Sequence, residues 1–161
     1  MSHEIEQQLK RAMRGLAQSV VVITTAQNGE RHAMAATAVC PVSMDPPSML
    51  FCINRSASAH AILSKGAAFC INLLSERHEA LARLCSGPTK GEARFGSDAF
   101  GMDDEDVPFV LDAQANITCV QDGRMSYGTH DVIIGKVRSV RVADTIEPLL
   151  YVNGTYAALA R

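Results

Sequence analysis

Apolar residues near the N-terminus recur at steps of three and four, which is the spacing of an amphipathic helix. Ile5 and Leu9 begin this spacing, and it continues through residues 4–17. A short helix is predicted within 56–63, because serines that favour helix starts precede it and a glycine that favours helix ends follows it. Another helix is predicted at 76–84, directly after a serine. The pattern therefore predicts three helices.

The segments between these helices are rich in β-branched residues, which is typical of strands. Residues 20–25 form one such run, Asn28-Gly29 follows as a hairpin dipeptide, and residues 32–42 continue in extended form. Asp45-Pro46-Pro47 predicts a loop, because proline has no N–H to donate to a strand ladder. Further strands are expected at 49–53, 67–74, 109–120, 124–142 and 149–156. Many strands and few helices predict a mainly β fold with flanking helices, a closed or partly closed barrel that forms one domain over residues 1–161.

The stretch between Cys85 and Val107 follows neither pattern. It is rich in Gly, Asp, Lys and Pro, and its large apolar residues are Phe95, Phe100 and Met102. Loops of this length without secondary structure are uncommon inside compact domains. We therefore expect a long functional loop here.

Charge and composition exclude several classes of partner. The 161 residues carry 15 Lys and Arg against 17 Asp and Glu, a net charge of −2, so the chain lacks the positive field that holds nucleic acid or an anionic membrane. Its apolar runs are far shorter than the roughly 20 residues of a membrane span, and its start lacks the order of a signal peptide. We expect a cytoplasmic protein with neither nucleic acid nor membrane as a partner.

The cysteines and histidines show no spacing typical of metal sites or disulfide frameworks. The five cysteines include no C-x-x-C pair, and the five histidines include no H-x-x-x-H pair. We expect neither a metal nor a disulfide. Signatures for a Rossmann phosphate loop, a Walker loop and a nucleophile elbow are also absent from the sequence.

Two stretches contain residues that suit binding of a flat, phosphorylated ligand. In the first, small and hydroxyl residues occupy two neighbouring strands at 36–47 and 51–58. Small side chains let a flat ligand approach the backbone, and polar groups beside a helix start can donate to a phosphate. The same residues also suit a plain hairpin followed by a helix cap. The second stretch, Tyr127-Gly128-Thr129-His130-Asp131, enters a strand, and its histidine alone is a weak signal.

Taken together, the motifs resemble the short-chain flavin reductase family, which supplies reduced flavin in two-component monooxygenases. They are A-T-A-V-C-x-V, the D-P-P loop, F-C-I-N-R-S-A-S, C-I-N-L-L-S, R-F and G-T-H-D, in this order from Val20 to Tyr156. The resemblance implies an FMN-binding split β-barrel with a Greek-key arrangement, dimeric in the family. It implies oxidation of NADH, with NADPH left open, and reduction of FMN or FAD for a separate flavin-dependent monooxygenase.

The resemblance also implies roles for individual residues. His130 would position the nicotinamide, and Asp45 of the D-P-P loop is included among the flavin-binding residues. The isoalloxazine would be lined, mainly through backbone groups, by Ala36, Thr37, Ala38, Val39, Cys40, Phe51, Cys52 and Ile53. The ribityl chain and phosphate would be reached by Asn54, Ser56 and Ser58, and the flavin would be covered by Arg94 and Phe95.

The sequence departs from the family pattern at three points. Thr129 stands where many members have Asp, which leaves the choice between NADH and NADPH open. Ala33-Met34-Ala35 replaces a G-x-T motif, and Gly154-Thr155-Tyr156 replaces G-R-Y. Two alternatives remain at this stage: a non-catalytic module that binds flavin or haem on the same barrel, and an oxidase of the pyridoxamine-phosphate type.

Overall fold

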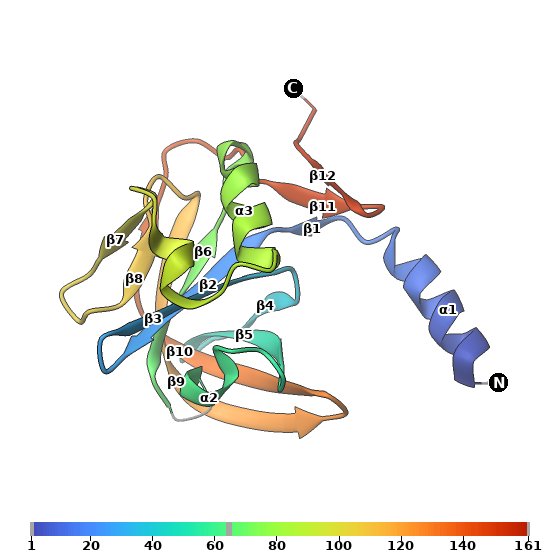
Figure 1. The fold of residues 1–161 in the computed structure, drawn as a ribbon, viewed down its shortest axis with the longest axis horizontal. Coiled ribbons are helices and arrows are strands. Elements are labelled where there is room, and N and C mark those ends of the chain that lie inside the picture. Colours follow the sequence, from blue (N-terminus) through green and yellow to red (C-terminus); the bar gives the residue numbers. More distant parts are fainter. Residues whose placement is uncertain (1, 64–65, 161) are drawn as a thin grey trace.

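The protein is described by a computed structural model that covers residues 2–63 and 66–160, shown in Figure 1. The helices are α1 (Ser2–Met13), α2 (His60–Leu63) and α3 (Glu79–Ser86), with short 3-10 helices η1 (Glu76–His78) and η2 (Gly91–Phe95). The strands are β1 (Gln18–Ser19), β2 (Val21–Gln27), β3 (Glu30–Ala36), β4 (Val39–Met44), β5 (Pro47–Asn54), β6 (Ala68–Leu73), β7 (Phe100–Met102), β8 (Pro108–Val110), β9 (Ala115–Tyr127), β10 (His130–Val142), β11 (Leu150–Val152) and β12 (Thr155–Ala157). The predicted mainly β fold with helices on its outside is confirmed.

Seven strands form one antiparallel sheet in the order β3-β2-β6-β9-β10-β5-β4. The first and last strands in this order, β3 and β4, are neighbours in sequence, yet they lie at opposite edges of the sheet. Thr37 and Ala38 connect them. The two edge strands, β3 and β4, do not pair with each other, so the barrel is open between them. This opening is the split that the predicted split barrel requires.

The sheet curls around an apolar core. One cluster unites buried side chains from five strands and α2: Val21, Ile23, Phe51, Ile53, Ala59, Leu63, Phe69, Ile71, Cys119 and Ile133. Side chains alternate between the two faces of a strand, so these residues share the inner face of the sheet. A second cluster lies on the other face of β2, where Val20 and Val22 pack with α3 and η2 residues. Every residue from Val20 to Thr25 is buried because β2 separates the two clusters.

Local turn chemistry accounts for the hairpins. Asn28 and Gly29 both adopt positive φ, at 54° and 80°, in the predicted β2–β3 hairpin. Asn153 and Gly154 turn β11 into β12 in the same way, a hairpin that the predicted single strand at 149–156 missed. The strand predicted at 124–142 is wrong as a single strand: Gly128, with φ of 56°, turns the chain inside it, so residues 124–127 end β9 and residues 130–142 form β10.

Three other expectations need correction. The predicted strand at 32–42 ends at Ala36, because the chain there crosses from one sheet edge to the other. The predicted strand at 109–120 is interrupted after Val110, where Asp112 adopts a φ of 55°. The stretch between Cys85 and Val107 is not a structureless loop, because it contains the end of α3, η2 and β7.

The first helix lies apart from the rest of the chain. Figure 1 shows α1, in blue, projecting from the body beside the small β1-β11-β12 sheet. None of its twelve described residues is buried. The predicted helix is confirmed, although it ends at Met13 rather than Ala17. Within 2–63 and 66–160, no helix combines the length and apolar character that crossing a bilayer requires.

Candidate functional site

Three adjacent strands bring most of the predicted binding residues to one end of the sheet. β5 pairs with β4 on one side and with β10 on the other. The Cys52 amide donates to the Ala38 carbonyl over 3.0 Å, and Asn54 lies opposite His130. Residues 36–40, residues 51–58 and His130 therefore meet where β5 ends.

The two faces of β5 have different environments at this end. Phe51 and Ile53 have no exposed surface and pack in the inner cluster, so they can meet a ligand only through backbone groups. Val39 also packs against this cluster. Cys52 is half-buried, and Cys40 and Ala38 are exposed. The side chains that reach solvent on these strands are therefore small, and the expected lining of a flavin by their backbone groups stays a prediction.

The segment after β5 forms a compact turn rich in hydrogen-bond donors. The Asn54 carboxamide oxygen accepts from the Ser56 amide at 2.9 Å and from its hydroxyl at 2.8 Å. The Arg55 amide donates to the Thr129 carbonyl at 3.0 Å, and its guanidinium donates to the Gly128 carbonyl. Ser56 and Ser58 are exposed. The turn therefore presents two hydroxyls and an arginine close to the β9–β10 hairpin.

His130 begins β10 and is exposed. Its Nδ1 lies 2.9 Å from the Thr129 hydroxyl, a contact whose donor depends on the histidine tautomer. On β9 its cross-strand partner is Tyr127, whose side chain is 83% exposed. An imidazole and an aromatic ring thus stand beside the turn, free to contact a second ligand.

A buried carboxylate beside His130 was missed from the sequence. Asp131 points to the inner face with no exposed surface, and its Oδ2 lies 2.5 Å from His60 Nε2 and 2.6 Å from Arg124 Nη2. The hydrogen bond from His60, with another from Ser126, lowers the pKa of Asp131 to about 2. Its only signal in the sequence was a charged residue entering an apolar strand.

A hollow of about 230 Å³ adjoins the connection between β3 and β4. Its lining includes Ala36 and Thr37 together with Tyr151 and Tyr156. The two rings pack edge to face with centroids 5.3 Å apart. Small residues facing aromatic rings suit a flat ring system.

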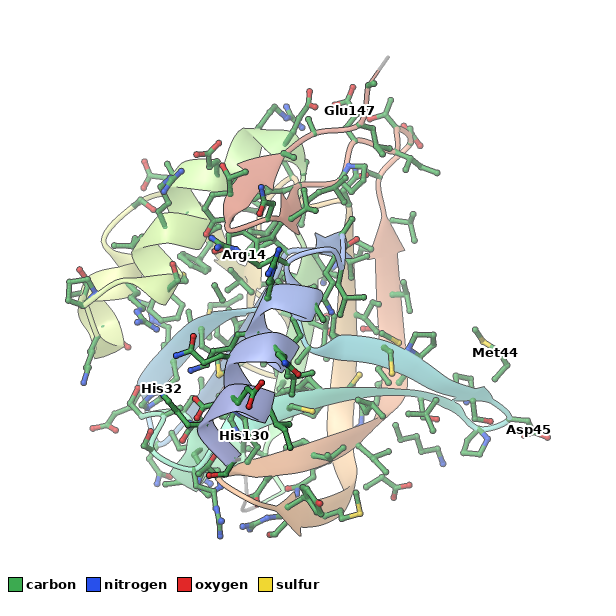
Figure 2. The ribbon with its side chains drawn as sticks, turned by 90° about the vertical axis from the view of Figure 1, so that its right-hand side faces the viewer. Arg14, His32, Met44, Asp45, His130 and Glu147 are labelled. Atoms are coloured by element: carbon green, nitrogen blue, oxygen red, sulfur yellow. The ribbon has the colours of Figure 1, made fainter. Side chains whose placement is uncertain are left out.

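Asp45 lies away from the other predicted residues. It sits at the tip of the β4–β5 hairpin, and Figure 2 places Asp45 and Met44 far from His130. β5 separates the two ends, and at about 3.3 Å per residue its length is more than 20 Å. The expected contact between Asp45 and the flavin stays a prediction. Within one chain, Asp45 lies at the end of β5 that is opposite to His130.

Arg94 and Phe95 are both buried. The Arg94 side chain donates to the carbonyls of Thr89 at 2.6 Å, Gly87 at 3.1 Å and Ala33. Phe95 packs on Phe100 in the second cluster. Both side chains thus bind η2 and its preceding loop to β3, and their expected cover over a flavin stays a prediction.

The groups at the end of β5 fit a flavin mononucleotide moiety. Phosphates accept hydrogen bonds from hydroxyls and arginine, and small residues at 36–40 offer a flat approach to backbone. The α2 helix has only four residues, so the donors come from the turn rather than from a helix dipole. In the described ranges, no group of three or more His, Cys, Asp or Glu side chains is placed to hold a metal ion.

Known proteins resemble the chain over nearly its whole length. The reductase component of FADH(2)-dependent resorcinol hydroxylase from Rhizobium sp. is 38% identical over 96% of this chain and 87% of its own. FMN reductase (NADH) RutF from Agrobacterium fabrum is 36% identical over 93% and 86%. The solved flavin reductase domain protein from Arthrobacter sp. FB24 superposes with a TM-score of 0.89 at 25% identity, over 97% of this chain and 96% of its own.

The family model for the flavin reductase like domain matches residues 13–160. This range contains the three strands, the turn after β5 and His130. It leaves out only most of α1 and the last residue. The chain therefore belongs to the flavin reductase like domain family.

Proposed function

We propose that this chain is an NADH-dependent flavin reductase that reduces FMN or FAD and releases the product to a separate flavin-dependent monooxygenase. One observation carries the proposal: a member of this family gathers phosphate donors, a small-residue strand surface and His130 at a single sheet end. The full-length relatives named as reductases support the same activity. The choice between FMN and FAD is left to experiment.

Bound flavin supplies the acceptor for a hydride from nicotinamide, so the protein contributes mainly orientation. Ser56, Ser58 and Arg55 hold the phosphate end. The backbone of residues 36–40 would hold the ring system, because the side chains there are small enough to allow close approach. His130 holds the nicotinamide portion of the dinucleotide over this surface without exchanging a proton.

The direct test is anaerobic oxidation of NADH, followed at 340 nm, with added FMN or FAD and with flavin bleaching followed at 450 nm. We expect bleaching that depends on added flavin and on NADH. Absence of turnover with NADH and NADPH, together with a retained chromophore, would favour a binding module instead.

The role of His130 is separable from folding. Because positioning by one hydrogen bond is worth about 1 to 1.5 kcal/mol, His130→Ala should raise the KM for NADH about tenfold and change kcat less. His3→Ala, an exposed histidine of α1, is the matched control and should leave both constants unchanged. A large loss of kcat at unchanged KM would contradict the positioning role.

A homodimer is part of the proposal. Ile5, Leu9 and Met13 follow one face of α1, and each is more than half exposed. Leu16, just after the helix, is also more than half exposed. An amphipathic helix is stabilised mainly by packing of its apolar face, which α1 lacks within one chain. A second copy of this chain covers that face.

Sedimentation of two variants tests the dimer. Leu9→Glu places a charge in the apolar stripe and should shift the protein towards monomer. Gln7→Glu adds the same charge on the opposite face of α1 and should leave the dimer intact. Equal sedimentation of both variants and the wild type as monomers would exclude the dimer.

The proposal places the enzyme in the cytoplasm. All five cysteines lie in the described part of the chain and are free thiols. Free thiols are typical of reducing compartments.

Copurification of a flavin-dependent monooxygenase, or its activation by the reduced flavin that this chain releases, would identify the partner.

A further inference from the structure

We infer that the His60–Asp131 pair is a positioning device that holds the Asn54–Ser58 turn in the shape that binds the flavin phosphate. The inference rests on the proposed function and adds residues for which the proposed mechanism has no use. Asp131 has no exposed surface, and the His60 side chain, which is 16% exposed, contacts Asp131. Both act through the turn.

The turn is anchored to the β9–β10 hairpin at both of its ends. At its start, Arg55 donates to the Gly128 and Thr129 carbonyls. At its end, His60 Nε2 lies 2.5 Å from Asp131 Oδ2. The residues between these anchors include Ser56 and Ser58, which are both exposed.

Hydrogen bonds within the turn connect the His60 contact at its end to the Arg55 contacts at its start. The His60 amide donates to the Ala57 carbonyl, and the Ala57 amide donates to the Asn54 carbonyl, each over 3.0 Å. Asn54 in turn accepts from Ser56. Displacement of His60 therefore moves the backbone that places both serines.

Asp131 is suited to this task because it is buried in a strand that is paired on both sides. It lies in the middle of three paired strands, opposite Ile53 on β5 and Ser126 on β9. Arg124 Nη2 lies 2.6 Å from the same oxygen that His60 contacts, so two side chains hold Oδ2. A buried carboxylate left without these partners is costly, so the pair persists when no ligand is bound.

The pair also links two substrates. Asp131 follows His130 directly in β10, and His130 lies opposite Asn54. One strand thus presents the nicotinamide contact on its exposed face and the anchor of the phosphate turn on its buried face. Shifting the anchor should weaken flavin binding first, because His60 joins the end of the turn to Asp131 on β10.

The test compares FMN affinity, measured by quenching of flavin fluorescence, in a set of variants. Asp131→Asn and His60→Leu should each weaken binding about tenfold, and the double variant should be no weaker than either single variant. His60→Gln keeps a donor near the Nε2 position and should bind within about twofold of wild type. Asp122→Asn, an exposed carboxylate of β9, is the control and should bind normally.

Deuterium uptake by the peptide spanning residues 54–60 provides a readout without flavin. Uptake should increase in Asp131→Asn and His60→Leu and stay at the wild-type level in His60→Gln. Should Asp131→Asn fail to fold, the two His60 variants complete the comparison.

The outcomes separate this inference from the proposed function. Wild-type affinity in both Asp131→Asn and His60→Leu, with normal turnover by the wild type, overturns the positioning role alone. A wild-type chain that neither binds nor reduces FMN or FAD overturns the proposed function, and the flavin role of the pair with it. Weakened affinity with an unchanged kcat and rescue by His60→Gln supports both.

Discussion

Replacement of Arg94 by methionine distinguishes a structural role from a role in covering the flavin. The substitution keeps most of the side-chain volume and removes the guanidinium. In the structure that guanidinium donates to the carbonyls of Ala33, Gly87 and Thr89, and the side chain is 8% exposed. A purely structural role therefore predicts a loss of stability in the absence of any ligand.

The size of that loss follows from the three hydrogen bonds. Each bond to a charged donor contributes about 1.5 to 3 kcal/mol, and bonds that share one donor group are not additive. We expect Arg94→Met to lower the free energy of unfolding by about 3 to 5 kcal/mol, a large part of the 5 to 15 kcal/mol typical of a domain. For a chain of this length the melting temperature should fall by about 10 °C.

The assay is thermal unfolding followed by circular dichroism, at fixed protein concentration and without flavin, because dimerisation and ligand binding both shift the midpoint. Arg77→Met, an exposed arginine of η1, is the matched control. An Arg94→Met protein that melts within about 2 °C of wild type would refute the structural reasoning. If the same variant then showed a raised KM for flavin, the role predicted from the sequence would be supported instead.

Three further predictions concern stability and thiol chemistry. A Cβ at Gly135 would overlap the Phe69 ring, so Gly135→Ala should destabilise the protein by about 1 to 3 kcal/mol in chemical denaturation, and an unchanged midpoint would show that the sheet can relax there. Native protein treated with iodoacetamide at pH 8 should be alkylated at no more than two cysteines, of which Cys40 is the exposed one, and mass spectrometry should find the remaining three labelled only after unfolding. Burial raises the pKa of these three thiols, to about 12 for Cys70, about 11 for Cys85 and about 12 for Cys119. The pKa of Asp131 is lowered to about 2 from about 3.9 when unfolded, so its contribution to stability is present above about pH 4 and is lost as the pH falls towards 2. The stability difference between wild type and Asp131→Asn should therefore narrow over that pH range, and a constant difference would contradict the assignment.

Signals that depend on near neighbours in the chain were readable from the sequence. The stripe beginning at Ile5 and Leu9 predicted α1, and Asn28-Gly29 predicted the first hairpin, because helix periodicity and turn conformation are local properties. Asn153-Gly154 has the same chemistry and was overlooked within an apolar run, although its signal was equally present.

The outline of the candidate site was also predictable, but only through resemblance to a family. Residues 36–40, 51–58 and His130 were expected to act together, and strand pairing places them at one sheet end. Periodicity identifies strands but does not say which strands pair. That choice depends on burial of side chains far apart in sequence, such as Phe51 and Phe69, whose rings lie 5.1 Å apart.

Tertiary structure alone decided the environments of Arg94, Asp45 and Asp131. The sequence suggested that Arg94 covers the flavin from a long loop, but the Arg94 guanidinium donates to carbonyls of β3 and of the loop itself. The length of β5 separates Asp45 from His130, and the pairing of β5, β10 and β9 buries Asp131 against His60 and Arg124. The sequence by itself determined which segments form helices and strands, and which residues carry groups able to bind a ligand or take part in a reaction. Which of those residues face solvent, and which are held by partners, was decided by contacts between segments many residues apart, because burial and hydrogen bonding are properties of the assembled sheet.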